Sequence, residues 1–503
     1  MSSSPTAKRR AGVLLHLTSL PGGESFWTKE QAQDADEFGT LGKQAFKFID
    51  FMADAGLEVW QMLPVVPTDL SPYQALSVHA GHPDLISLDD LLERGWISPE
   101  DIASDDKSLH GLKAVRAKCA ASFYRFLENP EGQQLKETFN AFCIEQEYWL
   151  KDFSLYSAIR ASCGNSSWID WPAELRRRDQ AALDAINGKL KNEIGIFDFE
   201  QFAFFTQWQA LRKYAADKNI LLFGDMPIFV GHDSADVWAQ QQYFQLNDEG
   251  HRLKVAGVPP DGFSETGQHW GNPHYAWEVM EADGFQWWLA RIRTQLNLFD
   301  WIRIDHFCGF EAYWSIPGDT KDARTGEWVK APGHALLSAF SEAYPELPLV
   351  AENLGLITEE VEQLRHKFHI PGMAVLQFAF DANPGNPYLP HNHHPSDIVY
   401  TGTHDNDTTV GWYQQADEKT RNQLNDYCFN SPEEMPWLLI KLALGSVGAV
   451  CIVPMQDFLG LDSEHRMNTP GTTEKNWKWK FSWEQVPQDL PQKIKGLVTI
   501  YNR

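Results

Sequence analysis

The sequence lacks any apolar stretch of the roughly 20 residues that a membrane-spanning helix needs. Its first residues, MSSSPTAKRR, include basic side chains, but no apolar run of signal-peptide length follows them. Cysteine is also scarce, because the six residues at positions 119, 143, 163, 308, 428 and 451 are scattered without a C-x-x-C pair. This pattern suits reduced thiols better than disulfides or structural zinc. We therefore expect a cytoplasmic protein with no membrane partner.

Positive charge is in short supply, with 43 Lys and Arg against 68 Asp and Glu and a formal net charge of -25. Surfaces that bind nucleic acids recruit Lys and Arg, so no nucleic-acid partner is expected. No G-x-G-x-x-G follows an expected strand, so no nucleotide cofactor is expected either. Aromatic residues, in contrast, are abundant, with 20 Trp. Most should pack the core, but aromatic faces also pack against the apolar faces of sugar rings.

Eight short runs rich in Val, Ile, Leu and Phe recur along the chain and are typical of buried parallel strands. Helical patterns lie between most of them, such as KQAFKFIDFMADAG after the first run and ITEEVEQLRHKF after the fifth, where Thr358 is expected to cap the helix. This alternation predicts an α/β fold of the (β/α)₈ (TIM) barrel type. The runs begin at Ala11, Glu58, Ile220, Asp300, Leu347, Met373, Asp397 and Gly448.

Two connections are too long for simple crossovers, and we interpret both as insertions into one catalytic barrel that spans residues 1–503. Residues 67–219 have helical patterns and predict a mainly helical subdomain. Residues 231–299 are rich in Gly, Pro and aromatics and predict a subdomain whose residues 258–273 form a lid loop over the active site. The residues after the eighth run are too few for a separate β-sandwich domain of about 100 residues.

Acidic residues fall at the ends of three of the expected strands, where the active sites of TIM barrels lie. Arg303 and Asp305 are two apart, so both side chains should point toward the barrel axis, where Arg303 would keep Asp305 ionised. Glu352 closes the fifth strand and Asp405 the seventh. Two carboxyl groups about 5 Å apart, one ionised and one protonated, are what retaining glycosyl transfer requires. Any one of these residues alone could equally serve in a salt bridge or a helix cap.

Three segments carry a resemblance to a known family. RIDH from Arg303, AENLG from Ala351 and THDN from Thr403 resemble the catalytic segments of glycoside hydrolase family 77, the 4-α-glucanotransferases of the α-amylase clan. The resemblance extends over nearly the whole chain, through LLHLTSLPG, WQMLPVVPT, SPYQ, GDMPIFV, DSADVW, VAGVPPD, TGQHWGNP, PGMAVLQFAF and RMNTPGT.

The resemblance implies roles for individual residues. Asp305 would be the nucleophile that forms a glucosyl-enzyme, Glu352 the acid/base and Asp405 the transition-state stabiliser. The donor sugar would be surrounded by Arg303, His306 and His404. The glucan groove would be lined by Ser71, Tyr73, Asp225, Asp261, Gln268, Trp270, Phe378 and Asn468. For its three aromatic members, ordinary packing is the alternative.

The chain departs from the family pattern at three places. The loop from Pro67 to Ser71 is shorter than usual and lacks a Gly-Tyr pair, so one outer aromatic contact is expected to be missing. Residues 79–83 read HAGHP where FAGNP is more common, and Cys308 stands where Arg is usual. These differences bear on contacts with individual sugar units and leave the expected reaction class unchanged.

A histidine-rich segment, PHNHHP, could suggest a metal site at His391, His393 and His394, but it lacks the ligand spacing of zinc sites. No metal and no cofactor is expected. The leading hypothesis is transfer of α-1,4-glucan segments to the 4-hydroxyl of another glucan or glucose, with α-1,4-glucans and maltooligosaccharides as partners. An amylase-like hydrolase and a catalytically silent glucan-binding protein are the alternatives.

Overall fold

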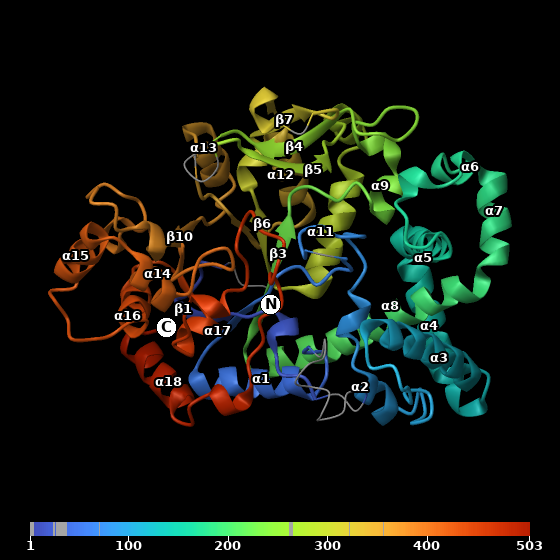
Figure 1. Ribbon diagram of the computed structural model, residues 1–503, viewed down its shortest axis with the longest axis horizontal. Coiled ribbons are helices and arrows are strands. Elements are labelled where there is room, and N and C mark those ends of the chain that lie inside the picture. Colours follow the sequence, from blue (N-terminus) through green and yellow to red (C-terminus); the bar gives the residue numbers. More distant parts are fainter. Residues whose placement is uncertain are drawn as a thin grey trace.

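A computed structural model describes residues 5–23, 26, 38–69, 71–260, 265–320, 322–355 and 357–503. Its centre is a sheet of eight parallel strands with the neighbour order β10-β11-β12-β1-β2-β3-β6-β9 (Figure 1). Each strand falls on one of the eight apolar runs, so the predicted (β/α)₈ barrel is confirmed. The strands are β1 (Arg10–Leu14), β2 (Val59–Gln61), β3 (Leu221–Pro227), β6 (Trp301–Asp305), β9 (Leu349–Ala351), β10 (Met373–Val375), β11 (Ile398–Tyr400) and β12 (Val450–Pro454).

Close packing between barrel strands explains one glycine in β1. Gly12 pairs with Val59 on one side and Ile452 on the other. A Cβ at this position would lie 2.4 Å from the Val59 carbonyl oxygen and 2.6 Å from Cδ1 of Ile452. Any side chain would therefore push neighbouring strands apart.

The seam between β9 and β10 is closed differently from the other strand pairs. The described residues give it one backbone hydrogen bond of its own, from the Ala351 amide to the Pro371 carbonyl at 2.8 Å. A side chain supplies the next contact, because Asn353 Oδ1 accepts from the Met373 amide at 2.8 Å. The Asn353 amide group in turn donates to Glu362 at 2.9 Å. Asn353 thus joins the two strands and the helix between them.

Helices surround the barrel and follow its strands as expected. Helix α1 covers the predicted KQAFKFIDFMADA segment and ends at Gly56 in the left-handed conformation. Thr358 caps α13 by accepting from the Val361 amide, as predicted. The helices that follow strands are α1 (Lys43–Ala55), α8 (Lys191–Asp217), α11 (Gln286–Leu298), α12 (Gly333–Ala343), α13 (Glu359–Lys367), α14 (Thr409–Gln415), α15 (Glu418–Tyr427), α16 (Trp437–Gly445), α17 (Met455–Phe458) and α18 (Leu490–Ile500).

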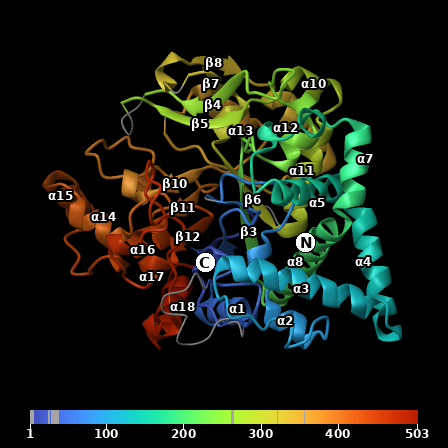
Figure 2. The same cartoon turned by 45° about the vertical axis from the view of Figure 1, so that its right-hand side comes forward.

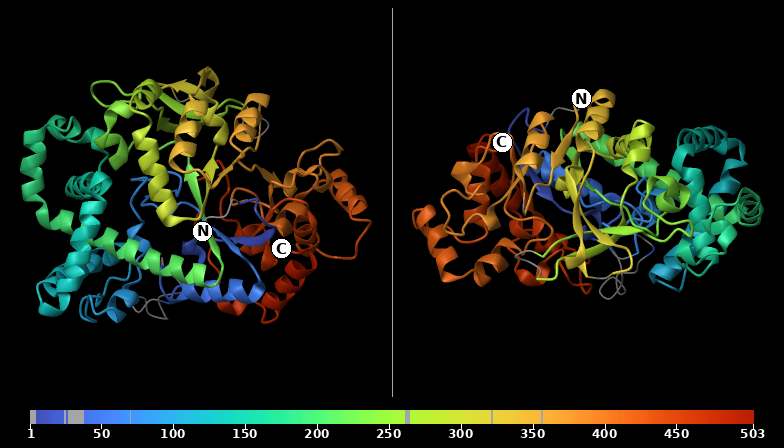
Figure 3. Two further views of the ribbon diagram at one scale, coloured as in Figure 1. Left: turned by 180° about the vertical axis from the view of Figure 1, so that it is seen from behind. Right: turned by 90° about the horizontal axis from the view of Figure 1, so that it is seen from above.

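The long connection between β2 and β3 is a group of helices beside the barrel (Figures 1 and 3). A buried ion-pair network joins two of them, because Arg116 on α3 contacts Glu200 on α8 and Asp84 at 2.7 Å each. Removing one partner from such a buried network typically costs 3–5 kcal/mol. The helices before α8 are α2 (Leu88–Glu93), α3 (Leu109–Leu127), α4 (Gln133–Glu145), α5 (Glu147–Ser162), α6 (Ala173–Arg176) and α7 (Gln180–Lys189).

A second sheet lies over one side of the barrel mouth (Figure 2). Its four antiparallel strands have the order β5-β4-β7-β8, with bounds β4 (Lys254–Val258), β5 (Gln268–Pro273), β7 (Ala312–Pro317) and β8 (Glu327–Lys330). The prediction of a loop is therefore wrong for Val258 and for residues 268–273. Glycine is typical of loops, but here it allows two strands to pack closely. A Cβ on Gly257 would lie 2.2 Å from the Gln268 carbonyl oxygen. Residues 261–264 of this segment lie outside the described residues.

The remaining parts of the chain are short. Helices α9 (Ala235–Ala239) and α10 (Trp277–Ala282) flank the β4–β5 hairpin. Residues 455–503 contain helices and no strand. Within the described part of the chain, none of the helices combines the length and apolar character needed to cross a membrane.

Candidate active site

The three carboxylates predicted from strand ends meet at one end of the barrel. Asp305 is the last residue of β6, Glu352 directly follows β9, and the loop after β11 carries Asp405. Asp225 joins them from β3, where it pairs in register with Arg303. Because parallel strands place their carboxyl ends at the same rim, four acidic side chains from different strands surround one mouth.

Arg303 lies at the centre of this group. Its Nη1 lies 2.7 Å from both carboxylate oxygens of Asp225 and 3.0 Å from Oδ1 of Asp305. Burial alone would lower the pKa of Arg303, but Asp225 and Asp305 raise it well above its usual value. The predicted pairing of Arg303 with Asp305 is confirmed. The closer contact with Asp225 was not anticipated, and it makes Arg303 a fixed positive charge shared between two carboxylates.

Glu352 is held by the chain segment that carries Asp305. Its Oε2 accepts from the His306 amide at 2.8 Å, and its Oε1 accepts from the Leu354 amide at 2.8 Å. Burial raises the pKa of Glu352 to about 7, an effect that Asp305 reinforces while Arg303 and the two amides oppose it. A carboxyl group with this pKa holds a proton at neutral pH and can also release it, as a general acid and base must.

Asp405 has a different environment, which favours its charge. Its Oδ1 accepts from Nδ2 of Asn468 at 2.6 Å, and its Oδ2 lies 3.3 Å from Nε2 of His404. Burial would raise the pKa of Asp405, but His404, Asn468 and Arg303 together hold it far below its usual range. The site thus contains one carboxyl group that retains a proton near neutral pH and one that stays ionised.

Tyr73 connects the two sides of the site. Its hydroxyl donates to Oδ2 of Asp225 at 2.9 Å and lies 2.9 Å from Nε2 of His404. The Tyr73 ring stacks on the His404 ring with centroids 5.2 Å apart. Ser71 supports this arrangement, since its Oγ accepts from the Tyr73 amide at 3.3 Å. These contacts place Tyr73 between Asp225 and the loop that carries Asp405.

His306 forms the opposite wall, where Trp270 reaches over from the second sheet. The backbone of His306 is in the left-handed region with φ of 55°, which is uncommon for a residue other than glycine. The Trp270 ring meets the His306 ring edge-on at 4.8 Å. Cys308, one of the departures from the family pattern, places its Sγ 3.4 Å from Nε2 of His306. Burial lowers the pKa of His306 to about 4, so its ring is neutral at pH 7.

The outer residues of the predicted groove have looser connections to this centre. Gln268 is exposed, and its Oε1 accepts from Nε1 of Trp270 at 3.1 Å. Phe378 packs edge-on against Tyr388 at 5.7 Å. Asp261 lies outside the described residues, so its place in the groove stays a prediction.

Three residues near the site were missed in the sequence. Arg466 donates from Nη2 to the Asp405 carbonyl and from Nε to the Asn468 carbonyl, both at 3.1 Å. Trp477 lies against Tyr73 with centroids 5.8 Å apart. Tyr388 lies near Glu352. Burial raises the pKa of Tyr388, and the charge of Glu352 raises it further. Arg466 could have been found, because it begins the RMNTPGT motif; the other two positions depend on tertiary contacts.

Two of the histidines that depart from family patterns or cluster in the sequence, His79 and His393, have structural partners. His79 is buried, and its Nδ1 lies 2.8 Å from Oγ1 of Thr294. His393 lies 2.6 Å from Oγ of Ser446 and 2.8 Å from the Tyr388 carbonyl, so both its ring nitrogens are occupied. Within the residues that the structure describes, no group of three His, Cys, Asp or Glu side chains could hold a metal ion.

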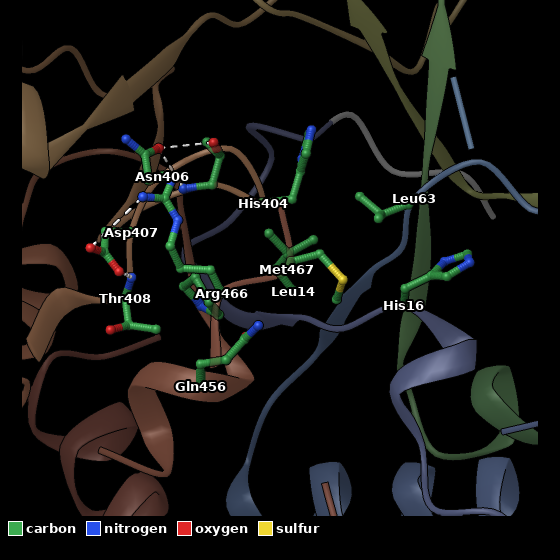
Figure 4. A pocket seen from close by; sticks show the side chains of 12 residues that line it. Leu14, His16, Leu63, His404, Asn406, Asp407, Thr408, Gln456, Arg466 and Met467 are labelled. Atoms are coloured by element: carbon green, nitrogen blue, oxygen red, sulfur yellow. Dashed lines mark hydrogen bonds and ion pairs between the residues drawn. The ribbon is translucent and has the colours of Figure 1, made fainter. Parts of the chain in front are cut away.

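A small pocket lies beside His404 (Figure 4). Its volume of about 20 Å³ is enough for one water molecule or one hydroxyl group. In Figure 4, Arg466 and Asp407 lie on one side of it and Leu63 and His16 on the other, with His404 above. The pocket therefore borders the His404 and Asp405 side of the site.

Comparison with known proteins decides the family. The family model described as 4-alpha-glucanotransferase matches residues 15–485. The chain belongs to the 4-alpha-glucanotransferase family. It is therefore a glycosyl-transferring enzyme. It is 45% identical over 487 residues to the 4-alpha-glucanotransferase of Thermus thermophilus, covering 94% of each chain. It is 42% identical over 516 residues to the chloroplastic/amyloplastic 4-alpha-glucanotransferase of Solanum tuberosum, covering 99% of this chain and 87% of that one.

Solved structures agree with this membership in the 4-alpha-glucanotransferase family. The amylomaltase of Streptococcus agalactiae in complex with acarbose matches with a TM-score of 0.91 and 35% identity, over 99% of this chain and 100% of that one. The amylomaltase of Corynebacterium glutamicum has a TM-score of 0.76 at 17% identity, over 99% and 76% of the two chains, and supports the fold. The resemblance inferred from the RIDH, AENLG and THDN segments is confirmed.

Proposed function

We propose that this enzyme transfers segments of α-1,4-glucans and maltooligosaccharides to the 4-hydroxyl of another glucan or glucose, through a covalent glucosyl-enzyme at Asp305. The observation that carries this proposal is the pair formed by Glu352 and Asp305. Glu352 retains a proton near pH 7, while the Asp305 carboxylate lies 3.0 Å from the buried cation of Arg303. The acid, Glu352, and the nucleophile, Asp305, therefore lie at the ends of adjacent strands.

In the first step, a carboxylate oxygen of Asp305 attacks C1 of the donor glucosyl unit. The bond between C1 and the glycosidic oxygen breaks as Glu352 delivers its proton to that oxygen, and the shortened chain leaves as an alcohol. Positive charge develops at C1 and the ring oxygen. Asp405, which stays ionised beside His404 and Asn468, stabilises that charge.

In the second step, Glu352 acts as the base. Its carboxylate takes the proton from the 4-hydroxyl of the acceptor as that oxygen attacks C1, and Asp305 leaves as a carboxylate. The two inversions give net retention at C1. The same residue can serve both steps because its pKa of about 7 keeps both protonation states accessible.

Three outcomes separate transfer from the alternatives when the enzyme is incubated with maltotriose. Glucose together with longer maltooligosaccharides, without new reducing ends, supports transfer. A steady rise in reducing ends supports an amylase-like hydrolase. Unchanged maltotriose, with retained binding, supports a catalytically silent glucan-binding protein.

The roles of the two carboxyl groups have their own test. Asp305→Asn should abolish turnover while glucan binding is kept, because the amide has the same shape but is a poor nucleophile. Glu352→Gln should be inactive on maltotriose yet still be glucosylated by an α-glucosyl fluoride, whose leaving group needs little protonation. Mass spectrometry should then find the label on Asp305. A label on another residue, or an Asp305→Asn variant within tenfold of wild type, would contradict the assignment.

The inserted segment 231–299 is proposed to favour transfer over hydrolysis, and residues 258–273 are the part of it that would act. The other inserted segment, 67–219, is proposed to be a separate helical subdomain. The support is Trp270, which reaches from β5 to the His306 ring at the edge of the site. Covering the glucosyl-enzyme would exclude water, whereas an acceptor glucan gains binding energy that orients its hydroxyl. Trp270→Ala should therefore raise the ratio of hydrolysis to transfer. If the ratio stays constant while both activities and the melting temperature fall, Trp270 only packs the sheet.

A further inference from the structure

The loop between β11 and α14 carries His404 and Asp405, and both of its ends are attached to one buried side chain. β11 and β12 are parallel neighbours in the sheet, so the loop after β11 lies beside α17, which directly follows β12. Asp457 belongs to α17, and its Oδ2 accepts from Oγ1 of Thr401 at 2.7 Å, at the start of the loop. At the far end, Thr409 donates from its amide to Oδ1 at 2.7 Å and from its Oγ1 to Oδ2 at 2.6 Å.

These contacts lie in the protein interior. Asp457, Thr401 and Thr409 are each 0% exposed. Burying a carboxyl group costs free energy, and an apolar side chain of similar size avoids that cost. Burial raises the pKa of Asp457, and the hydrogen bonds from Thr409 and Thr401 counteract this shift. What Asp457 provides, and an apolar residue could not, is a connection between the end of a barrel strand and the start of a helix.

Between its two attached ends, the loop is held in shape by its own side chains. Oδ1 of Asn406 accepts from the Thr403 amide at 2.8 Å and from Oγ1 of Thr403 at 2.9 Å. The same Oγ1 accepts from the Asp405 amide at 3.3 Å. A turn that is fixed within itself keeps its shape when it moves, so its position is set by the points at which it is attached. Asp457 supplies two of those points.

We propose that Asp457 is a positioning residue for the transfer reaction, which holds both ends of the β11–α14 loop and thereby keeps Asp405 where it stabilises the positive charge that develops at C1. The proposal rests on the glucan-transfer function proposed above. It gives a consequence for the reaction rate to a carboxyl group that is buried and cannot touch the sugar. A displacement of about 1 Å is enough to lower such a rate about a hundredfold.

The first test compares two replacements of Asp457. In Asp457→Asn, the amide oxygen can accept from the Thr409 amide, while the amide nitrogen donates to the two threonine hydroxyls, which rotate to accept. This variant should keep kcat within about threefold of wild type. Asp457→Leu forms none of these bonds and should lower kcat for maltotriose about a hundredfold, with KM changed by less than about threefold. A loss confined to kcat is expected when an interaction made in the transition state is weakened.

Asp101 offers a matched control. It is buried between α2 and α3, and it accepts from Oγ of Ser122 at 2.7 Å and from the amide and Oγ of Ser98 at 2.8 and 2.9 Å. Asp101→Leu therefore also removes two bonds from hydroxyls and one from an amide, and it should lower the melting temperature without changing kcat. If Asp457→Leu does not fold, Thr401→Val decides in its place, because it removes one hydroxyl at the strand end and should lower kcat about tenfold.

The second test asks whether the loss acts through Asp405. The rate of glucosyl-enzyme formation from α-glucosyl fluoride is measured for Asp457→Leu and Thr401→Val, each in the wild-type and the Asp405→Asn background. The fluoride needs little protonation, so a defect limited to Glu352 does not appear, whereas a displaced Asp405 slows the reaction with either donor. In the Asp405→Asn background the further loss should be less than about twofold, which is the coupling expected when one residue acts through the other.

Three results would overturn the proposal while leaving the transfer function standing. They are an unchanged kcat in folded Asp457→Leu or in Thr401→Val, an Asp457→Asn variant as impaired as Asp457→Leu, and a loss of the same size in both backgrounds, which a purely structural role would give. A wild-type enzyme that neither reacts with α-glucosyl fluoride nor transfers from maltotriose would instead refute the transfer function, and this inference with it.

Discussion

The raised pKa of Glu352 has a measurable consequence for folding stability. In the unfolded chain a glutamate titrates near 4.5, whereas Glu352 in the folded enzyme titrates near 7. Below 4.5 the carboxyl group is protonated in both states, so its effect on stability is largest and constant there. As the pH rises from 4.5 to 7, only the unfolded state loses the proton, and the free energy of unfolding falls. Above 7 both states are ionised and the loss is complete.

The size of this effect follows from the shift. At 1.36 kcal/mol per pKa unit, a group with these two values lowers the free energy of unfolding by about 2.5 kcal/mol between pH 5 and pH 8. Glu352→Gln removes the titration. The variant forfeits one backbone hydrogen bond, because an amide nitrogen cannot accept from the His306 or Leu354 amide, but that loss is the same at every pH. The difference in unfolding free energy, variant minus wild type, should therefore increase by about 2.5 kcal/mol from pH 5 to pH 8.

The measurement is urea unfolding of both proteins at several pH values, with the slope against urea concentration checked for each. Glu281→Gln, on an exposed position of α10, is the matched control and should show the same difference at every pH. A difference for Glu352→Gln that is flat between pH 5 and pH 8 would refute the argument. It would mean that Glu352 is ionised throughout, and another group would then have to supply the proton.

Three further predictions concern activity. Turnover of maltotriose should fall as the pH rises through about 7, because Glu352 loses its proton; with an α-glucosyl fluoride the glucosylation step should lose this dependence. Arg466→Met should lower kcat about tenfold with little change in melting temperature, because it releases the loop that holds Asn468 against Asp405. Steady-state kinetics and thermal unfolding measure these two effects, and an unchanged kcat would contradict the prediction. Activity should survive exhaustive treatment with EDTA, and its loss with recovery on adding a divalent ion would reveal a missed metal site.

Much of the barrel could be predicted because its strands are buried on both faces. Such strands appear in the sequence as continuous apolar runs, and all eight were found. Period-two alternation placed Arg303 and Asp305 on one face without further information. The hairpin of β4 and β5 could not be found in this way, because its glycines, which allow close strand packing, have the composition of a loop.

The electrostatics of the site depend on contacts that no local pattern contains. Asp225 and Arg303 are far apart in the sequence and meet only because β3 and β6 are neighbours in the sheet. The same holds for Trp477, which follows the last strand and reaches back to Tyr73. The carboxylates could be predicted from strand ends, but their unequal pKa values could not, since these depend on burial and on the amides that face each group.

The seam between β9 and β10 links the closure of the barrel to the placement of its acid. Asn353, which joins the two strands, is the residue next to Glu352 in the chain. A replacement of Asn353 that opens the seam would also shift the backbone that carries Glu352. Loosening the barrel wall would therefore displace the proton donor. If variants of this enzyme are screened only for turnover, the variants that are kept will therefore also keep the seam between β9 and β10 closed. This holds although stability itself is not selected.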